Sequence, residues 1–295
     1  MTDIDTRLAR LTLWGGPIDV EPLPGGMTNR NLLIRAPLGR FVARVAGNSC
    51  VHAIDRLAEQ AATRTAARAG LGPELVWAEA DLMILRHVEG HTLEISDFAR
   101  DPMQGRIAAL LRRIDDIMPG LYDGPILDRT PAALLSHYSR ELLAVPNRWC
   151  EAVEALMPTV AELTTRLGPM PRGFAHNDIH GANIIDDGDR LWLVDWEHAG
   201  RGQAMVDVAS LANNGLVSEA SAKEVLATWL GRPPHLHDLA DFAAMRLAAA
   251  LRDLFWGYAQ DALIAPDHGE LDRYIAINEE RVAAASMRVA HSFLP

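Results

Sequence analysis

Lysine and cysteine are almost absent from this chain. Lys223 is the only lysine among 295 residues, so nearly every fixed positive charge is an arginine. The two cysteines, Cys50 and Cys150, lie far apart in the sequence. This excludes a disulfide framework and is typical of a reducing compartment. No apolar run approaches the roughly 20 residues of a membrane span, and the opening MTDIDTRLARL lacks the basic-then-apolar order of a signal peptide. We therefore expect a cytoplasmic protein.

Positive charge is scarce overall. The chain has 28 Lys and Arg against 39 Asp and Glu, a formal net charge of −11. Nucleic acids and anionic membranes require a basic face, so neither is an expected partner, whereas a cationic small molecule suits an acidic chain. The length, with 49% apolar residues, permits a sizeable core and two lobes. The sequence leaves open whether the chain forms a homodimer.

One stretch carries the chemistry of the chain: GFAHNDIHGANIIDDGDRLWLVDWEHAG, residues 173–200. It places His176, Asp178 and Asn183 in the order H-x-D-x-x-x-x-N. Two short apolar runs flank DDGD, whose Asp-Gly pair predicts the turn of a β-hairpin. Asn183 then stands at the entry of the first strand and Asp195 at the exit of the second, so their side chains are expected to be near neighbours.

These residue types suit phosphoryl transfer. An amide oxygen from Asn183 and a carboxylate from Asp195 are hard oxygen ligands of the kind that Mg²⁺ prefers, and Glu197 is expected to complete the metal site. The alternative for Glu197 is that it faces a substrate cation. Asp178, on the preceding loop, can accept the proton of an alcohol and orient it for attack on the γ-phosphate of ATP. The same set of residues occurs in the protein-kinase pattern.

The motifs HNDIHGANII and LVDWEHAG resemble the aminoglycoside phosphotransferase and choline kinase superfamily, and the DWE form resembles its choline/ethanolamine and thiamine kinases. The resemblance implies an α+β, protein-kinase-like fold of two lobes. The expected N-terminal nucleotide-binding lobe, residues 1–88, is an antiparallel sheet with one helix. The expected C-terminal lobe, residues 89–295, is mostly helical and holds the catalytic hairpin. His198 departs from the choline-kinase pattern, which usually has tyrosine there.

In the first lobe, alternating runs separated by glycines predict paired strands near residues 31–35 and 40–46. The stretch GGMTNRN resembles the phosphate-covering hairpin of the family, which suggests Thr28 and Asn29 as nucleotide contacts. Kinases of this type hold the α- and β-phosphates with a cation on the third strand, and Arg44 is the candidate because no lysine is available. Its expected partner is Glu59, on a helix predicted over residues 52–69.

Helical periodicity then predicts helices near residues 104–117, 131–143, 149–167, 218–230, 236–260 and 269–290, besides a short one at the N-terminus to about Trp14. MVDVASLANN opens a further helix. The resemblance implies that Asp207, near its start, braces the catalytic loop through backbone hydrogen bonds. His176 is interpreted as a residue that organises this loop and does not carry a proton.

The acceptor is the least determined part of the site. The family phosphorylates alcohols such as choline, ethanolamine, thiamine and aminoglycosides. Aromatic faces with nearby carboxylates select a quaternary ammonium, and RDLFWGYAQ offers Trp256, with Asp253 one helical turn before it. Choline or ethanolamine is therefore the expected substrate; thiamine, an aminoglycoside, or a pseudokinase that only binds nucleotide are the alternatives. Preference for ATP over GTP stays open.

Overall fold

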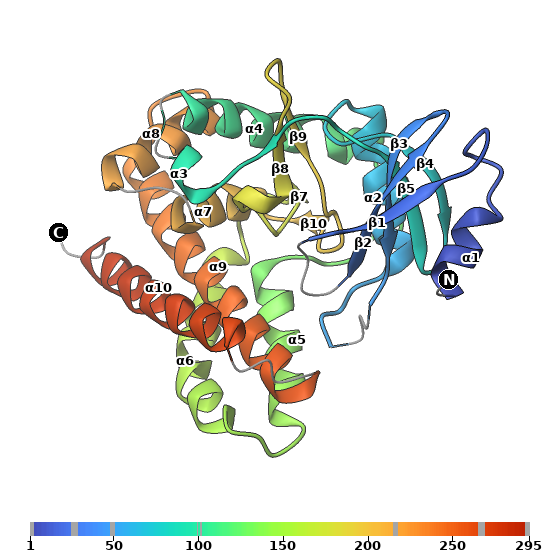
Figure 1. Cartoon of the computed structure of the whole chain (residues 1–295). Coiled ribbons are helices and arrows are strands. Elements are labelled where there is room, and N and C mark those ends of the chain that lie inside the picture. Colours follow the sequence, from blue (N-terminus) through green and yellow to red (C-terminus); the bar gives the residue numbers. More distant parts are fainter. Residues whose placement is uncertain are drawn as a thin grey trace.

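The computed structural model describes residues 3–24, 29–47, 51–98, 100, 102–214, 218–264 and 269–292. Figure 1 shows two lobes: a β-sheet with a few helices on one side, a larger group of helices on the other, and the catalytic hairpin between them. This is the expected α+β, two-lobed kinase-like architecture. Among the described residues, no helix combines the length and the apolar character needed to cross a membrane.

The first lobe is built on a five-stranded antiparallel sheet. Its strand order is β1-β2-β3-β5-β4, with bounds β1 Asp19–Leu23, β2 Arg30–Ala36, β3 Gly39–Val45, β4 Leu75–Glu79 and β5 Leu82–Arg86. Alternation along the strands directs apolar side chains into a small core of eight buried residues: Leu8, Trp14, Leu32, Ile34, Phe41, Ala43, Leu82 and Ile84. The predicted strands are therefore confirmed.

The N-terminal helix is shorter than predicted. Helix α1 covers Asp3–Ala9 and stops well before Trp14. The indole of Trp14 is instead buried in the sheet core, where it packs edge-on against Phe41 at 5.2 Å and donates a hydrogen bond to the Leu8 carbonyl at 2.7 Å. Burial of this large ring favours a turn over continuation of the helix.

The helix predicted over residues 52–69 also begins later. Helix α2 covers Arg56–Arg68, and residues 52–55 form a separate loop. Ala53 has φ +56°, a left-handed conformation that interrupts a right-handed helix, and Asp55 caps α2 by accepting the Ala58 N–H at 2.9 Å. The loop thereby places His52 in the interior, where its side chain is fully buried.

Helix α2 contacts both lobes, packing against β4 of the sheet and against α4, Met103–Leu121, of the second lobe. Its buried Ala62 and Ala66 lie in the larger core, together with Leu71 just after the helix, and not in the core of the sheet. Glu59, on the same helix, is also buried. The helix thus stands between the nucleotide-binding sheet and the catalytic lobe.

The second lobe is helical, as predicted. Its helices are α3 Ile95–Phe98, α4 Met103–Leu121, α5 Pro131–Leu143, α6 Cys150–Leu167, α7 Met205–Asn214, α8 Glu219–Leu230, α9 Leu236–Leu263 and α10 Glu270–Ser292. Helix α9 packs against α5, α6, α7 and α10, so it forms the centre of the larger core. Both the catalytic loop and the acceptor side of the site rest on this group of helices.

The catalytic hairpin consists of β8, Ile184–Asp186, and β9, Leu191–Leu193. Gly188 turns between them with φ +95°, a conformation that glycine adopts without strain. Strand β6, His91–Thr92, pairs with β8, while β7, Gly173–Ala175, pairs with β10, Gly200–Gly202. The chain therefore joins the sheet of the hairpin soon after leaving β5. The expected division of the two lobes between residues 88 and 89 stays a prediction.

Candidate active site

The catalytic loop lies between β7 and a short 3-10 helix, Gly181–Asn183, and backbone hydrogen bonds fix its start. Asp207, buried on the first turn of α7, accepts the backbone N–H of His176 at 2.7 Å and that of Asn177 at 2.8 Å. Asn177 itself has φ +67°, which asparagine tolerates better than most residues. Burial raises the pKa of Asp207 to about 7, although the two N–H donors oppose this shift.

His176 is fully buried beneath the loop. Its Nε2 donates to the Val194 carbonyl at 3.0 Å, and its Nδ1 accepts the Asp178 N–H at 3.3 Å. Together these contacts require the neutral tautomer with the proton on Nε2. Burial lowers the pKa of His176 to about 4, so the ring is neutral at neutral pH. The ring thus links the catalytic loop to the end of β9.

Asp178 is ionised in this setting. Burial opposes its charge, but His180, whose Nε2 lies 3.4 Å from Oδ2, outweighs that cost together with neighbouring histidines and lowers the pKa of Asp178. Asn183 donates through Nδ2 to the Asp178 carboxylate at 2.8 Å and to its carbonyl at 3.0 Å. The side chain of Asp178 keeps 34% of its surface exposed, so one of its faces can receive a ligand.

Asn183 is oriented by these bonds. Within the described residues, its side-chain hydrogen bonds to Asp178 both use Nδ2. The acceptor oxygen Oδ1 is therefore left for another partner. Backbone pairing of Asn183 with Val194 at 2.9 Å places this asparagine and Asp195 at the same end of the hairpin.

Asp195 follows β9 in the left-handed region, with φ +68°. Arg44 chelates its carboxylate: Nη1 donates to Oδ2 at 3.0 Å, and Nη2 forms a second, shorter bond to Oδ1. Burial raises the pKa of Asp195 to about 7; Arg44 opposes the shift, while Glu197 and Asp178 add to it. Burial and the neighbouring carboxylates destabilise the ionised form of Asp195, so a bound cation would stabilise it.

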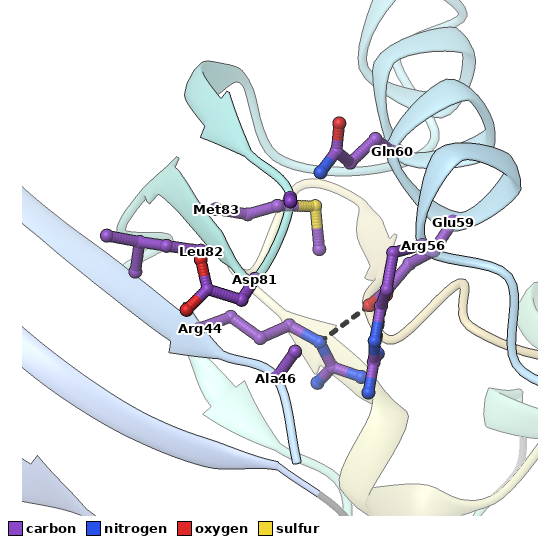
Figure 2. A pocket seen from close by; sticks show the side chains of 9 residues that line it. Arg44, Ala46, Arg56, Glu59, Gln60, Asp81, Leu82 and Met83 are labelled. Carbon is purple, nitrogen blue, oxygen red and sulfur yellow. Dashed lines mark hydrogen bonds and ion pairs between the residues drawn. The ribbon is translucent and has the colours of Figure 1, made fainter. Parts of the chain in front are cut away.

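Arg44 stands on β3 at the centre of an ion network that joins the lobes. Its Nε donates to Glu59 Oε1 at 2.8 Å, and Nη2 also reaches Glu197 Oε2 at 3.1 Å. Asn29, at the start of β2, donates to the same Glu197 oxygen at 2.7 Å. Thr28 lies outside the described residues. Figure 2 shows Arg44 extending from its strand toward Glu59 on α2.

A second arginine, which sequence reasoning missed, completes the network. Arg56, the first residue of α2, donates through Nη1 to Glu59 Oε2 at 2.6 Å and to Glu197 Oε2 at 3.1 Å. Its Nη2 reaches Asn29 Oδ1 at 3.1 Å. Its position three residues before Glu59, at i and i+3 of one helix face, is the signal that could have identified it.

The residues present fit a divalent metal. Oxygens of Glu59, Asp195 and Glu197 all lie within 4.8 Å of one another. Such carboxylates, with the amide oxygen of Asn183 near the same end of the hairpin, form the hard donor set that Mg²⁺ favours. Arg44 engages all three carboxylates, so a metal and this guanidinium compete for the same oxygens.

Two aromatic residues that contact Trp256, His52 and Tyr274, were not identified as site residues from the sequence. Trp256, half-buried on α9, stacks on His52 at 4.9 Å and meets Tyr274 of α10 edge-on at 5.3 Å. Burial lowers the pKa of His52 to about 4, and its Nε2 lies 2.8 Å from Gln260 Oε1, so a neutral ring covers one side of the tryptophan. His52 and Tyr274 escaped notice because long-range packing alone brings them here.

Asp253 lies close to this aromatic group. Burial, followed by the charges of Asp253 and Asp178, raises the pKa of the Tyr274 phenol well above its usual value. Arg252 donates to the carboxylate of Asp253 at 2.6 Å. Asp253 and Trp256 lie three residues apart on α9, as expected from the sequence.

This chain is similar to several known proteins. Protein LicA of Haemophilus influenzae is 22% identical over 224 residues, which cover 72% of this chain and 63% of that relative. Among the similar solved structures with a TM-score of 0.74 are two bacterial proteins. One is a choline/ethanolamine kinase family protein from Mesorhizobium loti, 22% identical, covering 97% of this chain and 93% of that one. The other is the choline kinase LicA from Streptococcus pneumoniae, 20% identical, covering 98% of both chains.

A further structure of the same fold, with a TM-score of 0.72, is LicA in complex with AMP. The profile of the phosphotransferase enzyme family matches residues 19–250, which contain the sheet, α2, the catalytic loop and most of α9. This chain therefore belongs to the phosphotransferase enzyme family.

Proposed function

We propose that this protein transfers the γ-phosphate of ATP to the hydroxyl of a small cationic alcohol, with choline or ethanolamine as the first candidates. One observation carries the proposal. An ionised Asp178, held by Asn183 on a loop braced by Asp207, belongs to the same hairpin unit as the carboxylates of Asp195 and Glu197. Kinases that phosphorylate alcohols need these parts together.

On the nucleotide side, Arg44 is the proposed ligand of the α- and β-phosphates, with Glu59 holding its guanidinium through Nε. Asn29, and Thr28 before it, are proposed contacts of the covering hairpin. Asn183, Asp195 and Glu197 are the proposed metal ligands, and Mg²⁺, when bound there, would neutralise charge on the β- and γ-phosphates.

On the acceptor side, Asp178 accepts a hydrogen bond from the substrate hydroxyl and aligns its oxygen with the γ-phosphorus. Its lowered pKa keeps it ionised at neutral pH, so it is always ready to accept the proton. A weak base suits a loose transition state, in which the proton leaves late. The proton passes to a carboxylate oxygen of Asp178 as the new P–O bond forms and the bond between the γ-phosphorus and the β,γ-bridging oxygen breaks, so that ADP leaves with the electron pair of that bond.

The cationic acceptor is proposed from the aromatic group. Trp256 and Tyr274 meet edge-on, and burial, together with the negative charges of Asp253 and Asp178, raises the pKa of the phenol. Aromatic faces beside negative charge attract an ammonium group. The names of the similar proteins from Mesorhizobium loti and Streptococcus pneumoniae support the same class.

The test is ADP release from Mg·ATP by the purified protein, with choline, ethanolamine, thiamine and kanamycin offered separately. Turnover with choline or ethanolamine is expected. Turnover with thiamine or kanamycin alone would keep the reaction and replace the acceptor. If no ADP is released with any of the four acceptors, while ATP still raises the melting temperature, the result would favour a pseudokinase and count against the proposal.

A further inference from the structure

The guanidinium groups of Arg56 and Arg44 lie next to each other in the site. The side chain of Arg56 is 15% exposed, and Figure 2 shows its guanidinium beside that of Arg44, with Glu59 between helix and strand. Both guanidinium groups donate to Glu59 and both donate to Glu197 Oε2. Two cations this close together are tolerated only because carboxylates lie against them.

The place of Arg56 on its helix is electrostatically unfavourable. It is the first residue of α2, a helix of 13 residues, and the positive end of the helix dipole disfavours a cation there. Its Nε is buried and has no hydrogen-bond partner within the described part of the chain. A charge at an adverse position with an unused donor indicates an anion that is added to the site from outside.

Glu197 links this arginine to the proposed metal site. Its Oε2 receives three donors: Asn29, Arg44 and Arg56. A divalent cation bound to Glu197 and Asp195 would displace and repel both guanidinium groups. Each of them would then need a new acceptor with negative charge, and Glu59 alone cannot balance two arginines.

We propose that Arg56 is a second phosphate-binding residue, which turns from Glu197 to the polyphosphate of the nucleotide when Glu197 turns to the metal. The inference rests on the proposed function. Arg44 and Arg56 then hold the phosphates from β3 and from the start of α2, and Glu59 orients both through its two oxygens. The ligand class is a nucleoside di- or triphosphate.

Calorimetric titration with Mg·ATP, Mg·ADP and adenosine tests this role. Arg56→Gln is expected to weaken binding of both Mg-nucleotides by about 10- to 100-fold, the size of a lost charge-assisted hydrogen bond, and to leave adenosine binding unchanged. Arg56→Lys, which keeps the charge without the planar fork, should recover part of the loss. Arg64→Gln is the matched control, because Arg64 is an exposed arginine of the same helix.

A double-mutant comparison separates direct contact from support of Arg44. Arg56→Gln should weaken Mg·ATP binding further in an Arg44→Gln background; no further loss there would reduce Arg56 to a support of Arg44 and overturn the inference. Equal Mg·ATP affinity in the unaltered chain and Arg56→Gln would overturn the inference alone. Failure of the unaltered chain to bind Mg·ATP would overturn the proposed function as well.

Discussion

The nucleotide side and the catalytic loop of this site are held together by different forces. On the proposed nucleotide side, Arg44 and Arg56 share the carboxylates of Glu59 and Glu197, and Arg44 also pairs with Asp195, so a bound metal and phosphates would replace some of those ion pairs. The loop is instead fixed by backbone hydrogen bonds and a neutral, buried ring of His176. The loop is thus preformed, whereas the ion network must exchange partners on binding.

The largest effect on activity is expected from a change of Asp195, a proposed metal ligand within the ion network. Asp195→Ala removes a proposed metal ligand together with the main partner of Arg44, and Mg-dependent ADP release should be abolished. Glu59 and Glu197 remain as partners of Arg44, so the chain should still fold, with the lower stability expected when one partner of a buried ion pair is removed. Asp189→Ala, at the exposed tip of the hairpin, is the control. If Asp195→Ala keeps its Mg-dependent activity, then Asp195 is not an essential metal ligand, and the ion network does not exchange partners as inferred.

A change of Asp178 on the catalytic loop should slow phosphoryl transfer without weakening nucleotide binding. Asp178→Asn is expected to lower kcat by about 10²- to 10⁴-fold, the usual size of a lost general base. The fold and the affinity for Mg·ATP should be retained, because Asp207 and His176 still hold the loop, while loss of the ion pair with His180 should lower the melting temperature. Steady-state kinetics and calorimetry check both statements. Near-normal turnover would remove Asp178 from its proposed role.

The neutral histidines predict how stability depends on pH. The pKa values of His52 and His176 are lowered from 6.5 to about 4, so the unfolded chain binds more protons than the folded one between these values. As pH falls from 6.5 to 4, each ring should remove about 3 kcal/mol from the free energy of unfolding. His180 acts oppositely: its pKa, lowered by burial but raised more by Asp178, is about 9, and its contribution is lost as pH rises from 6.5 through 9.

Urea unfolding across this pH range measures the effect. His52→Phe keeps an aromatic ring against Trp256 but cannot titrate. Between pH 6.5 and 4, its free energy of unfolding should therefore fall by about 3 kcal/mol less than that of the unaltered chain. His237→Gln, which replaces an exposed histidine, is the matched control. An unchanged slope in His52→Phe would mean that this ring is not held neutral.

The smallest effect concerns the acceptor. Trp256→Leu should raise KM for the cationic alcohol by about 2- to 30-fold, the range of a lost cation–π contact, and leave KM for ATP unaltered. Trp192→Leu, on the catalytic hairpin, is the matched control. An equal rise of KM for ATP would show that Trp256 supports the lobes through His52 and does not select the acceptor.

Local patterns predicted the parts of the site that are close in sequence. The strands, most helices and the hairpin follow from apolar periodicity and glycine turns, and the order of His176, Asp178 and Asn183 is visible in one motif. The start of α2 was wrong because no local rule predicts the left-handed Ala53. His52 and Tyr274 were missed because packing between distant segments alone brings them to the site, whereas Arg56 could have been identified from its i,i+3 spacing to Glu59.

The packing of α2 has a mechanical consequence. Arg44 is carried by the sheet, whereas Glu59 is carried by a helix whose Ala62 and Ala66 are anchored in the core of the other lobe. Helix α2 also contacts the sheet, where Gln60 donates to the Glu79 carbonyl of β4, so a displacement of the sheet against the larger core would strain the contacts made by this helix. The 2.8 Å contact between Arg44 Nε and Glu59 Oε1 is one of them.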